Sequence, residues 1–172
     1  VEEPVELFDL TPTLLELAGL APAYTQFGRS LVPQLHGAAG DPERAVYAEG
    51  GYDPHEPHAF EGRPTEAIFR DPAAIYYPKG LQQQEAPTSV CRSAMVRTRD
   101  YKLIRRTLDI CELYDLRADP GELHNVYTAP AYADVRAQLE TRLLDWYLHT
   151  ADMVPPDADP RGWVRNWERP GA

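Results

Sequence analysis

The chain has 172 residues, of which 43% are hydrophobic and 26% charged, the composition of an ordinary globular domain. Its net charge is −10, which argues against binding to nucleic acid or to an anionic membrane, because both surfaces repel an acidic protein. No stretch approaches the roughly 18 apolar residues of a transmembrane helix. Seventeen prolines and eleven glycines predict short elements separated by many loops.

Residues 1–44 predict two short helices. In the first, within residues 5–19, leucines recur at helical spacing, Asp9 is a good N-cap, and Gly19 stands where a left-handed C-terminal cap is expected. The second, within residues 28–37, repeats the same order: a capping serine, a proline in the first turn and a terminal glycine. We expect it to be only a turn or two long.

A strand and a long loop are predicted next. Residues 44–48 are a β-rich run that precedes two glycines and predicts a buried strand. Residues 52–88 contain six prolines and keep neither a period of 2 nor one of 3.6, so we expect a long loop, a segment that is usually functional or disordered. Its aromatic side chains favour a packed loop. They are Tyr52, Phe60, Phe69, Tyr76 and Tyr77.

Three further strands and the clearest helix follow. Residues 93–98 and 102–107 predict a hairpin that turns at residues 99–101, and residues 112–116 predict a third strand. Residues 130–150 predict a helix with one apolar face. This face consists of Tyr132, Val135, Leu139, Leu143 and Trp146, widened by Leu144, Tyr147 and Leu148. The sum is an α+β fold: a small antiparallel sheet of about four strands packed on one long C-terminal helix.

Two clusters of polar residues favour structural roles over chemical ones. The first has the spacing of a turn whose backbone groups need side-chain partners, and consists of Asp115, Asp119, Glu122 and Asn125. The second is a basic hairpin, in which a sulfate or phosphate clamp is conceivable but solvated strand polarity is the commoner outcome. It consists of Arg97, Arg99, Lys102, Arg105 and Arg106.

Cys91 and Cys111 are the only cysteines, too few for a disulfide scaffold, and they do not form a CxxC pair. If the hairpin turns at residues 99–101, residues 109–111 lie opposite position 91, and we expect the two cysteines to be close. They either form a disulfide or are ordinary buried thiols. A disulfide would favour an exported protein.

Four stretches together resemble the sulfatase family of the alkaline-phosphatase superfamily. Residues 5–20, VELFDLTPTLLELAGL, are similar to its "D-L-x-P-T-L-L-x-L-A-G" segment, and residues 28–37, GRSLVPQLHG, to "G-x-S-L-x-P-x-L-x-G". Residues 95–105, MVRTRDYKLIR, resemble its "R-T-x-x-Y-K-L-I" segment, and residues 112–126, ELYDLRADPGELHNV, resemble "E-L-Y-D-L-x-x-D-P-x-E-x-x-N-L". Each stretch alone is a weak signal, but all four in this order are specific.

The resemblance implies a division into domains. In the family, a large α/β domain with a mixed central sheet carries the active site, and a small C-terminal subdomain packs against it. Residues 1–44 would then be the last helices of the large domain, residues 45–152 the C-terminal subdomain, and residues 153–172 an irregular tail. The rest of the large domain would be the partner of this chain.

The resemblance also implies the chemistry of the longer protein. Sulfatases hydrolyse sulfate esters with a formylglycine made from Cys or Ser in a C/S-x-P/A-x-R motif, and a divalent cation, usually Ca²⁺, offsets charge on the sulfate oxygens. Neither cysteine here fits: Cys91 is followed by Ser93 and Met95 where Pro/Ala and Arg are needed. We therefore expect no catalytic residue and no metal ligand in this segment, an inactive segment on its own, and both centres upstream. Family resemblance also favours an exported location, periplasmic or secreted.

The candidate substrate-binding residues are His55 and His58, in the segment EGGYDPHEPHAFE of residues 49–61. Pro57 between them limits the convergence of ligands, which makes zinc or calcium unfavourable there. In sulfatases the loop after this strand can reach the rim of the sulfate pocket. The resemblance thus implies that the histidines donate hydrogen bonds to a substrate hydroxyl or sulfate oxygen. The alternative is two surface histidines in a turn.

Three functions remain open at this point. The leading one is the C-terminal part of a sulfatase acting on a sulfated small molecule or carbohydrate, with phosphoester or phosphonate hydrolysis as its close variant. The second is a non-catalytic binding module that uses the aromatic segment of residues 52–77. The third is a stand-alone hydrolase built on His55 and His58.

Overall fold

Two compact units make up the chain in the computed structural model, which describes residues 3–22, 26–55 and 71–151. One unit comprises residues 1–41 with 146–172, and the other comprises residues 42–145. Each is described by itself. No helix among the described residues is long and apolar enough to cross a membrane.

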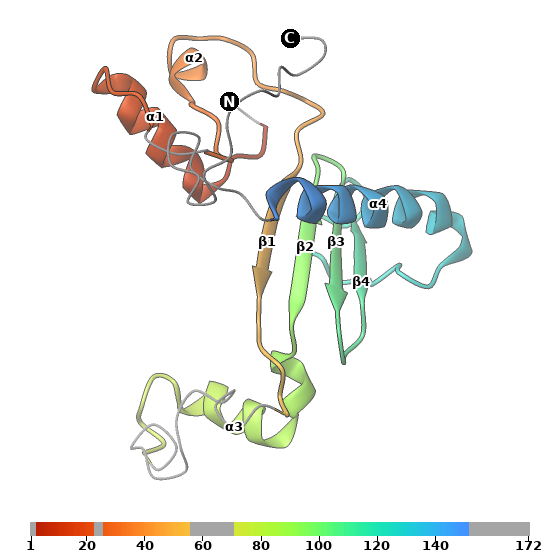
Figure 1. Cartoon of the computed structure of the whole chain (residues 1–172). Helices are drawn as coiled ribbons and strands as arrows, with labels where there is room; N and C mark the ends of the chain where they lie inside the picture. Colours follow the sequence, from red (N-terminus) through yellow and green to blue (C-terminus); the bar gives the residue numbers. More distant parts are fainter. Residues whose placement is uncertain (1–2, 23–25, 56–70, 152–172) are drawn as a thin grey trace, which may run out of the picture. The chain divides into compact units, whose positions relative to one another are not determined.

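The second unit is built on a four-stranded antiparallel sheet in the order β1-β2-β3-β4. The strands are β1 (Val46–Gly50), β2 (Ser93–Arg97), β3 (Tyr101–Arg106) and β4 (Glu112–Asp115). A short 3-10 turn, η4 (Pro130–Tyr132), leads into helix α4 (Ala133–Thr150), which lies across one face of this sheet (Figure 1). The predicted α+β fold, with its four strands and long C-terminal helix, is confirmed.

A row of three apolar residues across the sheet forms the centre of the core. Val96 of β2 pairs with Leu103 of β3, which in turn pairs with Leu113 of β4, and all three side chains are 0% exposed. On α4, Leu139 and Leu143 are buried as predicted. Each fully buried side chain of this size stabilises the fold by roughly 1.5–3 kcal/mol, so the row fixes the register of the three strands.

Polar side chains attach α4 to the same face of the sheet. The guanidinium of Arg105 lies 3.0 Å from the carboxylate of Glu140 and also donates to the hydroxyl of Tyr127. The Tyr127 hydroxyl donates to Glu140 at 2.9 Å, and the Tyr132 hydroxyl donates to Asp115 at 3.3 Å. The first group of contacts joins β3 to α4, and the second joins β4 to η4.

Most of the predicted basic hairpin has acidic partners. Besides Arg105, Lys102 pairs with Glu122 at 2.5 Å, and Arg106 forms two close contacts with Glu112, at 2.9 and 2.8 Å. Cations paired in this way hold strands together and have less capacity for an added anion. The pairing therefore favours the structural interpretation of the hairpin.

The predicted turn of polar residues after β4 is also structural. The side-chain oxygen of Asn125 accepts from the N–H groups of Leu113 and Tyr127, and its amide donates to the carbonyl of Cys111. Asp115 accepts from two backbone N–H groups, and Asp119 accepts from that of His124. These oxygens complete the backbone hydrogen bonding of a turn, as their spacing predicts.

In the first unit, a 3-10 turn, η1 (Leu7–Asp9), leads into α1 (Leu10–Leu17), and α2 is Val32–Leu35. Asp9 is the N-cap residue of α1 as predicted, but its carboxylate does not cap that helix. It is fully buried and accepts from the N–H groups of Glu6 and Arg29, both at 2.8 Å. The acid therefore joins the two segments that precede the helices.

Both helix ends follow the predicted glycine pattern. Gly19 has φ +69° and Gly37 has φ +91°, conformations that favour glycine. After α1, the Leu20 N–H donates to the Leu15 carbonyl, and after α2, the Ala38 N–H donates to the Pro33 carbonyl. These are the six-to-one bonds of a Schellman ending.

The expectation of one continuous loop over residues 52–88 is wrong. Helix α3 (Tyr77–Glu85) lies within it, and the 3-10 turn η3 (Pro87–Val90) begins at its end. The buried positions of α3 are Gly80 and Gln83, so its inward face carries no hydrophobic period. Of the aromatic residues expected to pack, Tyr76 is exposed. Phe60 and Phe69 lie outside the described residues, as does the predicted tail.

The expectation that the two cysteines are close assumed a three-residue turn between β2 and β3, and the structure has a shorter one. Thr98 and Tyr101 are hydrogen-bonded to each other, so only residues 99–100 form the turn. The Thr107 N–H donates to the Arg92 carbonyl, and this register places position 108, not 111, opposite Cys91. Both cysteines are free thiols, Cys91 buried and Cys111 half-buried.

The predicted apolar face of α4 is too wide on one side. Leu144 and Leu148 are exposed, and Tyr147 is exposed as well. A helix that covers a sheet on one side buries only a narrow stripe of its surface, and here the stripe centres on Leu139 and Leu143.

This difference yields a matched test of the core. Replacing Leu139, 5% exposed, with alanine should destabilise the protein by about 2–5 kcal/mol, because it opens a cavity between α4 and the sheet. Leu144→Ala, on the same helix at 58% exposure, should change stability by less than about 0.5 kcal/mol. Urea denaturation measures both. Equal losses would show that α4 does not cover the sheet in this orientation.

Candidate functional site

The candidate site begins where β1 ends. Gly51 follows the strand with φ +79°, and a Cβ there would lie 2.2 Å from the carbonyl oxygen of Cys91. The next residue, Tyr52, donates its N–H to the carbonyl of Val90 at 3.0 Å and forms a parallel bridge with Cys91. This close passage of two backbone segments fixes the direction in which the chain leaves the sheet.

His55 is held just beyond this crossing by Asp53. One carboxylate oxygen of Asp53, Oδ1, lies 2.9 Å from the backbone nitrogen of His55 and 2.9 Å from its ring Nδ1. The imidazole is nevertheless 81% exposed. The ring is therefore anchored through one nitrogen while most of its surface remains accessible to a ligand.

The electrostatics of the pair favour an ionised carboxylate. The pKa of Asp53 is lowered, chiefly by the hydrogen bond from the His55 backbone N–H and then by that from its ring, with a further contribution from the charge of Arg92. Because the folded-state pKa is depressed, these bonds persist above the ordinary carboxyl pKa and are lost only as the pH falls through the folded value. The anchor is thus present at neutral pH.

The second candidate residue, His58, lies outside the described residues, and so does Glu56, so the structure does not test whether the two histidines converge. Within residues 3–22, 26–55 and 71–151, no group of three His, Cys, Asp or Glu side chains is placed to hold a metal ion. The described residues therefore do not fit a calcium centre of the sulfatase type.

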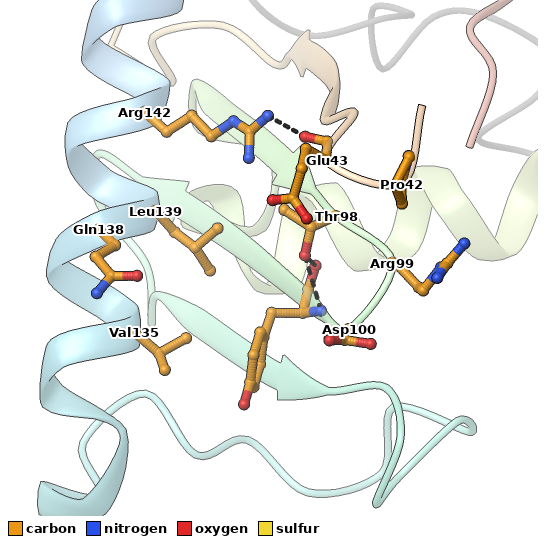
Figure 2. A pocket seen from close by; sticks show the side chains of 10 residues that line it. Pro42, Glu43, Thr98, Arg99, Asp100, Val135, Gln138, Leu139 and Arg142 are labelled. Carbon is orange, nitrogen blue, oxygen red and sulfur yellow. Dashed lines mark hydrogen bonds between the residues drawn. The ribbon is translucent and has the colours of Figure 1, made fainter. Parts of the chain in front are cut away.

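A separate hollow of about 280 Å³ lies at the opposite end of β1, beside the β2–β3 turn (Figure 2). Leu139 and Val135 of α4 form its apolar wall, and Arg142 donates to the backbone carbonyl of Glu43. This hollow could not be predicted from the sequence, because a turn, a loop and a helix distant in sequence form it together.

What the described part of the site offers chemically is hydrogen bonding to a ligand. An exposed imidazole anchored by a carboxylate offers one hydrogen-bonding nitrogen. Catalysis of acyl, phosphoryl or sulfuryl transfer would need a nucleophile within hydrogen-bond reach of such a base. No serine, threonine or cysteine contact with the His55 ring is found among the described residues.

The chain is similar to known proteins over most of its length. The family model described as N-sulphoglucosamine sulphohydrolase, C-terminal, matches residues 55–148, more than half of the chain. An N-acetylglucosamine-6-O-sulfatase of Bacteroides thetaiotaomicron is 30% identical over 153 residues, which cover 88% of this chain and 22% of that protein.

Solved structures give the same picture. The phosphonate monoester hydrolase of Agrobacterium radiobacter is 28% identical with a TM-score of 0.56, over 82% of this chain and 24% of that one. A protein solved in complex with its substrate D-glucosamine-2-N,6-O-disulfate is 26% identical with a TM-score of 0.56, over 88% of this chain and 25% of that one. The chain thus spans about a quarter of the length of these three relatives.

The backbone crossing at Gly51 can be tested against its neighbour. Gly51→Ala should destabilise the protein by about 2 kcal/mol or more, because the added methyl meets the Cys91 carbonyl and the left-handed φ disfavours alanine. Gly50→Ala is the control: an added Cβ there has no atom within 4 Å, and less than about 0.5 kcal/mol should be lost. Denaturant unfolding compares them. If both variants were equally stable, the crossing would not fix the loop.

Proposed function

The chain belongs to the family of the C-terminal domain of N-sulphoglucosamine sulphohydrolase, in the sulfatase branch of the alkaline-phosphatase superfamily, and we propose that it is the C-terminal subdomain of a sulfuric ester hydrolase. In this role it supplies scaffold and part of the rim of the substrate pocket. The observation that supports the rim most directly is the exposed, carboxylate-anchored imidazole of His55, directly after the first strand of the subdomain.

The proposed division of labour places the reactive groups elsewhere in the longer protein. The formylglycine nucleophile and the Ca²⁺ that sulfatases use would belong to the large α/β domain. One observation from the sequence supports this: neither cysteine stands in a C/S-x-P/A-x-R motif. The residues of this chain would therefore bind and orient the substrate and exclude water, without a covalent step.

The first unit fits the proposed contact with a large domain. The leucines of α1 are exposed: Leu14 is 64% exposed, and Leu10 and Leu17 are exposed as well. A short helix with an uncovered apolar face is only marginally stable alone and gains stability from a packing partner. Residues 1–44 as the last helices of the large domain would give this face its partner.

The proposed substrate is a sulfated carbohydrate that His55 and His58 contact at the rim. Support comes from the matched proteins: the Bacteroides sequence is an N-acetylglucosamine-6-O-sulfatase, and one matched structure was solved with a glucosamine disulfate as its substrate. We also propose an exported protein, periplasmic or secreted, on the strength of the family resemblance. The two free cysteines add no support to that location.

Hydrolysis of a phosphonate monoester is the second candidate. It is favoured by the likeness to the Agrobacterium enzyme, whose identity to this chain and TM-score match those of the sulfatase relatives. Sulfate monoesters and phosphonate monoesters both present a tetrahedral anion, so the scaffold of the subdomain would serve either. The rim is where the two substrates would be distinguished.

Kinetics of the protein that joins this chain to a formylglycine-bearing domain test the proposal. His55→Ala should lower kcat/KM for a sulfated glucosamine about tenfold, mainly through KM, because one hydrogen bond to the substrate is lost. The matched control is His124→Ala, which removes an equally exposed imidazole and should leave kcat/KM unchanged.

Three outcomes would contradict the proposal. Equal kinetics for the His55 and His124 variants would remove His55 from the rim. Faster turnover of a phosphonate monoester than of any sulfate ester would favour the second candidate. Turnover by the 172-residue chain alone, abolished by His55→Ala, would favour a stand-alone hydrolase.

A further inference from the structure

The anchor on His55 constrains which ring nitrogen carries the proton. Asp53 Oδ1 lies 2.9 Å from Nδ1, a normal hydrogen-bond distance. An ionised carboxylate is an acceptor only, so the hydrogen between these atoms must belong to Nδ1. The depressed pKa of Asp53 keeps that carboxylate ionised at neutral pH.

A neutral imidazole has one N–H and one lone pair. With the hydrogen fixed on Nδ1, the exposed Nε2 of a neutral His55 carries the lone pair and accepts a hydrogen bond. It cannot donate one to a sulfate or phosphonate oxygen, which are acceptors as well. Of the two partners expected for His55, a hydroxyl or a sulfate oxygen, only the hydroxyl remains, and the ring accepts its hydrogen bond.

We propose that Asp53 is a positioning residue that holds His55 in the Nδ1–H tautomer, so that Nε2 accepts a hydrogen bond from a hydroxyl group of a carbohydrate substrate. This inference rests on the proposed function, since it assumes that His55 reaches the substrate. It deepens that function by defining the substrate class. A sugar sulfate with a free hydroxyl near the ester satisfies Nε2, whereas an aryl sulfate without hydroxyl groups leaves it unpaired.

The same geometry should distinguish substrates that have a hydroxyl group near the ester from substrates that lack one. A site built to hydrogen-bond a hydroxyl rejects the analogue that lacks it, because the polar atom of the site loses its partner on binding. His55 is largely exposed, so the effect of this one bond should be moderate, about tenfold in kcat/KM. The two bonds of Asp53, one to the backbone N–H of His55 and one to its ring Nδ1, matter because they limit the ring to one orientation before the substrate arrives.

The chain contains two internal references for the tautomer. The Nδ1 of His36 lies 3.0 Å from the carbonyl oxygen of Val32, also an acceptor only, so His36 must carry its hydrogen on Nδ1 as well. The Nδ1 of His124 lies 3.6 Å from Asp119, beyond hydrogen-bond distance, so this carboxylate does not fix its tautomer. His124 resembles His55 in exposure and in having a nearby aspartate.

Nitrogen-15 NMR of the imidazole rings in the 172-residue chain at pH 8 tests the positioning directly. His55 and His36 should both show a protonated Nδ1 and an unprotonated Nε2, whereas His124 should show the Nε2–H form or a mixture. In Asp53→Asn, the side-chain amide can donate as well as accept, so the Nδ1–H share of His55 should fall. A wild-type His55 with the same tautomer mixture as His124 would overturn the inference and leave the proposed function untouched.

Kinetics of the longer protein test the substrate class. Asp53→Asn should reduce the ratio of kcat/KM for a sulfated sugar to that for 4-nitrophenyl sulfate about five- to tenfold, mainly through the KM of the sugar. A sugar sulfate whose neighbouring hydroxyl is replaced by hydrogen should lose the same factor in the wild-type protein.

The results distinguish the positioning role of Asp53 from the role of His55 at the rim. If His55→Ala lowers the ratio but Asp53→Asn does not, the positioning role is overturned and the rim role stands. If neither variant lowers it, the rim role itself fails. If Asp53→Asn lowers kcat/KM for both substrates equally, the residue acts on the fold and not on the choice of substrate.

Discussion

The row of Val96, Leu103 and Leu113 across three strands is the constraint on which the second unit depends. These side chains are completely removed from solvent, and a slip of one residue in any strand would turn its apolar residue to the other face. Helix α4 lies across the sheet (Figure 1) with Leu139 and Leu143 buried, and the Arg105–Glu140 ion pair joins it to β3. The register of the sheet is therefore determined by the burial of these apolar side chains, and ion pairs contribute less to it.

That register determines where the candidate site lies. With β2 fixed, the pairing of Gly50 with Ser93 ends β1 at one defined point, and Gly51 must then pass against the Cys91 carbonyl. His55 follows after a short, hydrogen-bonded turn. The sequence indicated this histidine through a family resemblance, but not its anchor: Asp53 was visible as a neighbour, whereas the two bonds to one oxygen depend on backbone angles that composition does not reveal.

The strands and the long helix were predictable because each has a clear hydrophobic pattern and a recognisable turn beside it. Helix α3 was not, because its buried positions are Gly80 and Gln83, which give no apolar signal. The register opposite Cys91 was misplaced for a different reason: the turn is shorter than expected by one residue, and this shifts every partner beyond it. Asp9 shows that contacts distant in sequence are also hard to predict. Its place at the start of the helix was predictable, but its bond to Arg29, twenty residues away, was not.

The central claim is that this chain presents His55 to the substrate of a sulfatase. The most direct measurement is a crystal structure of the protein, with the domain that completes it, bound to a sulfated glucosamine. We expect a substrate hydroxyl about 3 Å from Nε2 of His55, with Asp53 still bonded to Nδ1. A ligand bound more than about 6 Å from that ring, or a sulfate oxygen against Nε2, would contradict it.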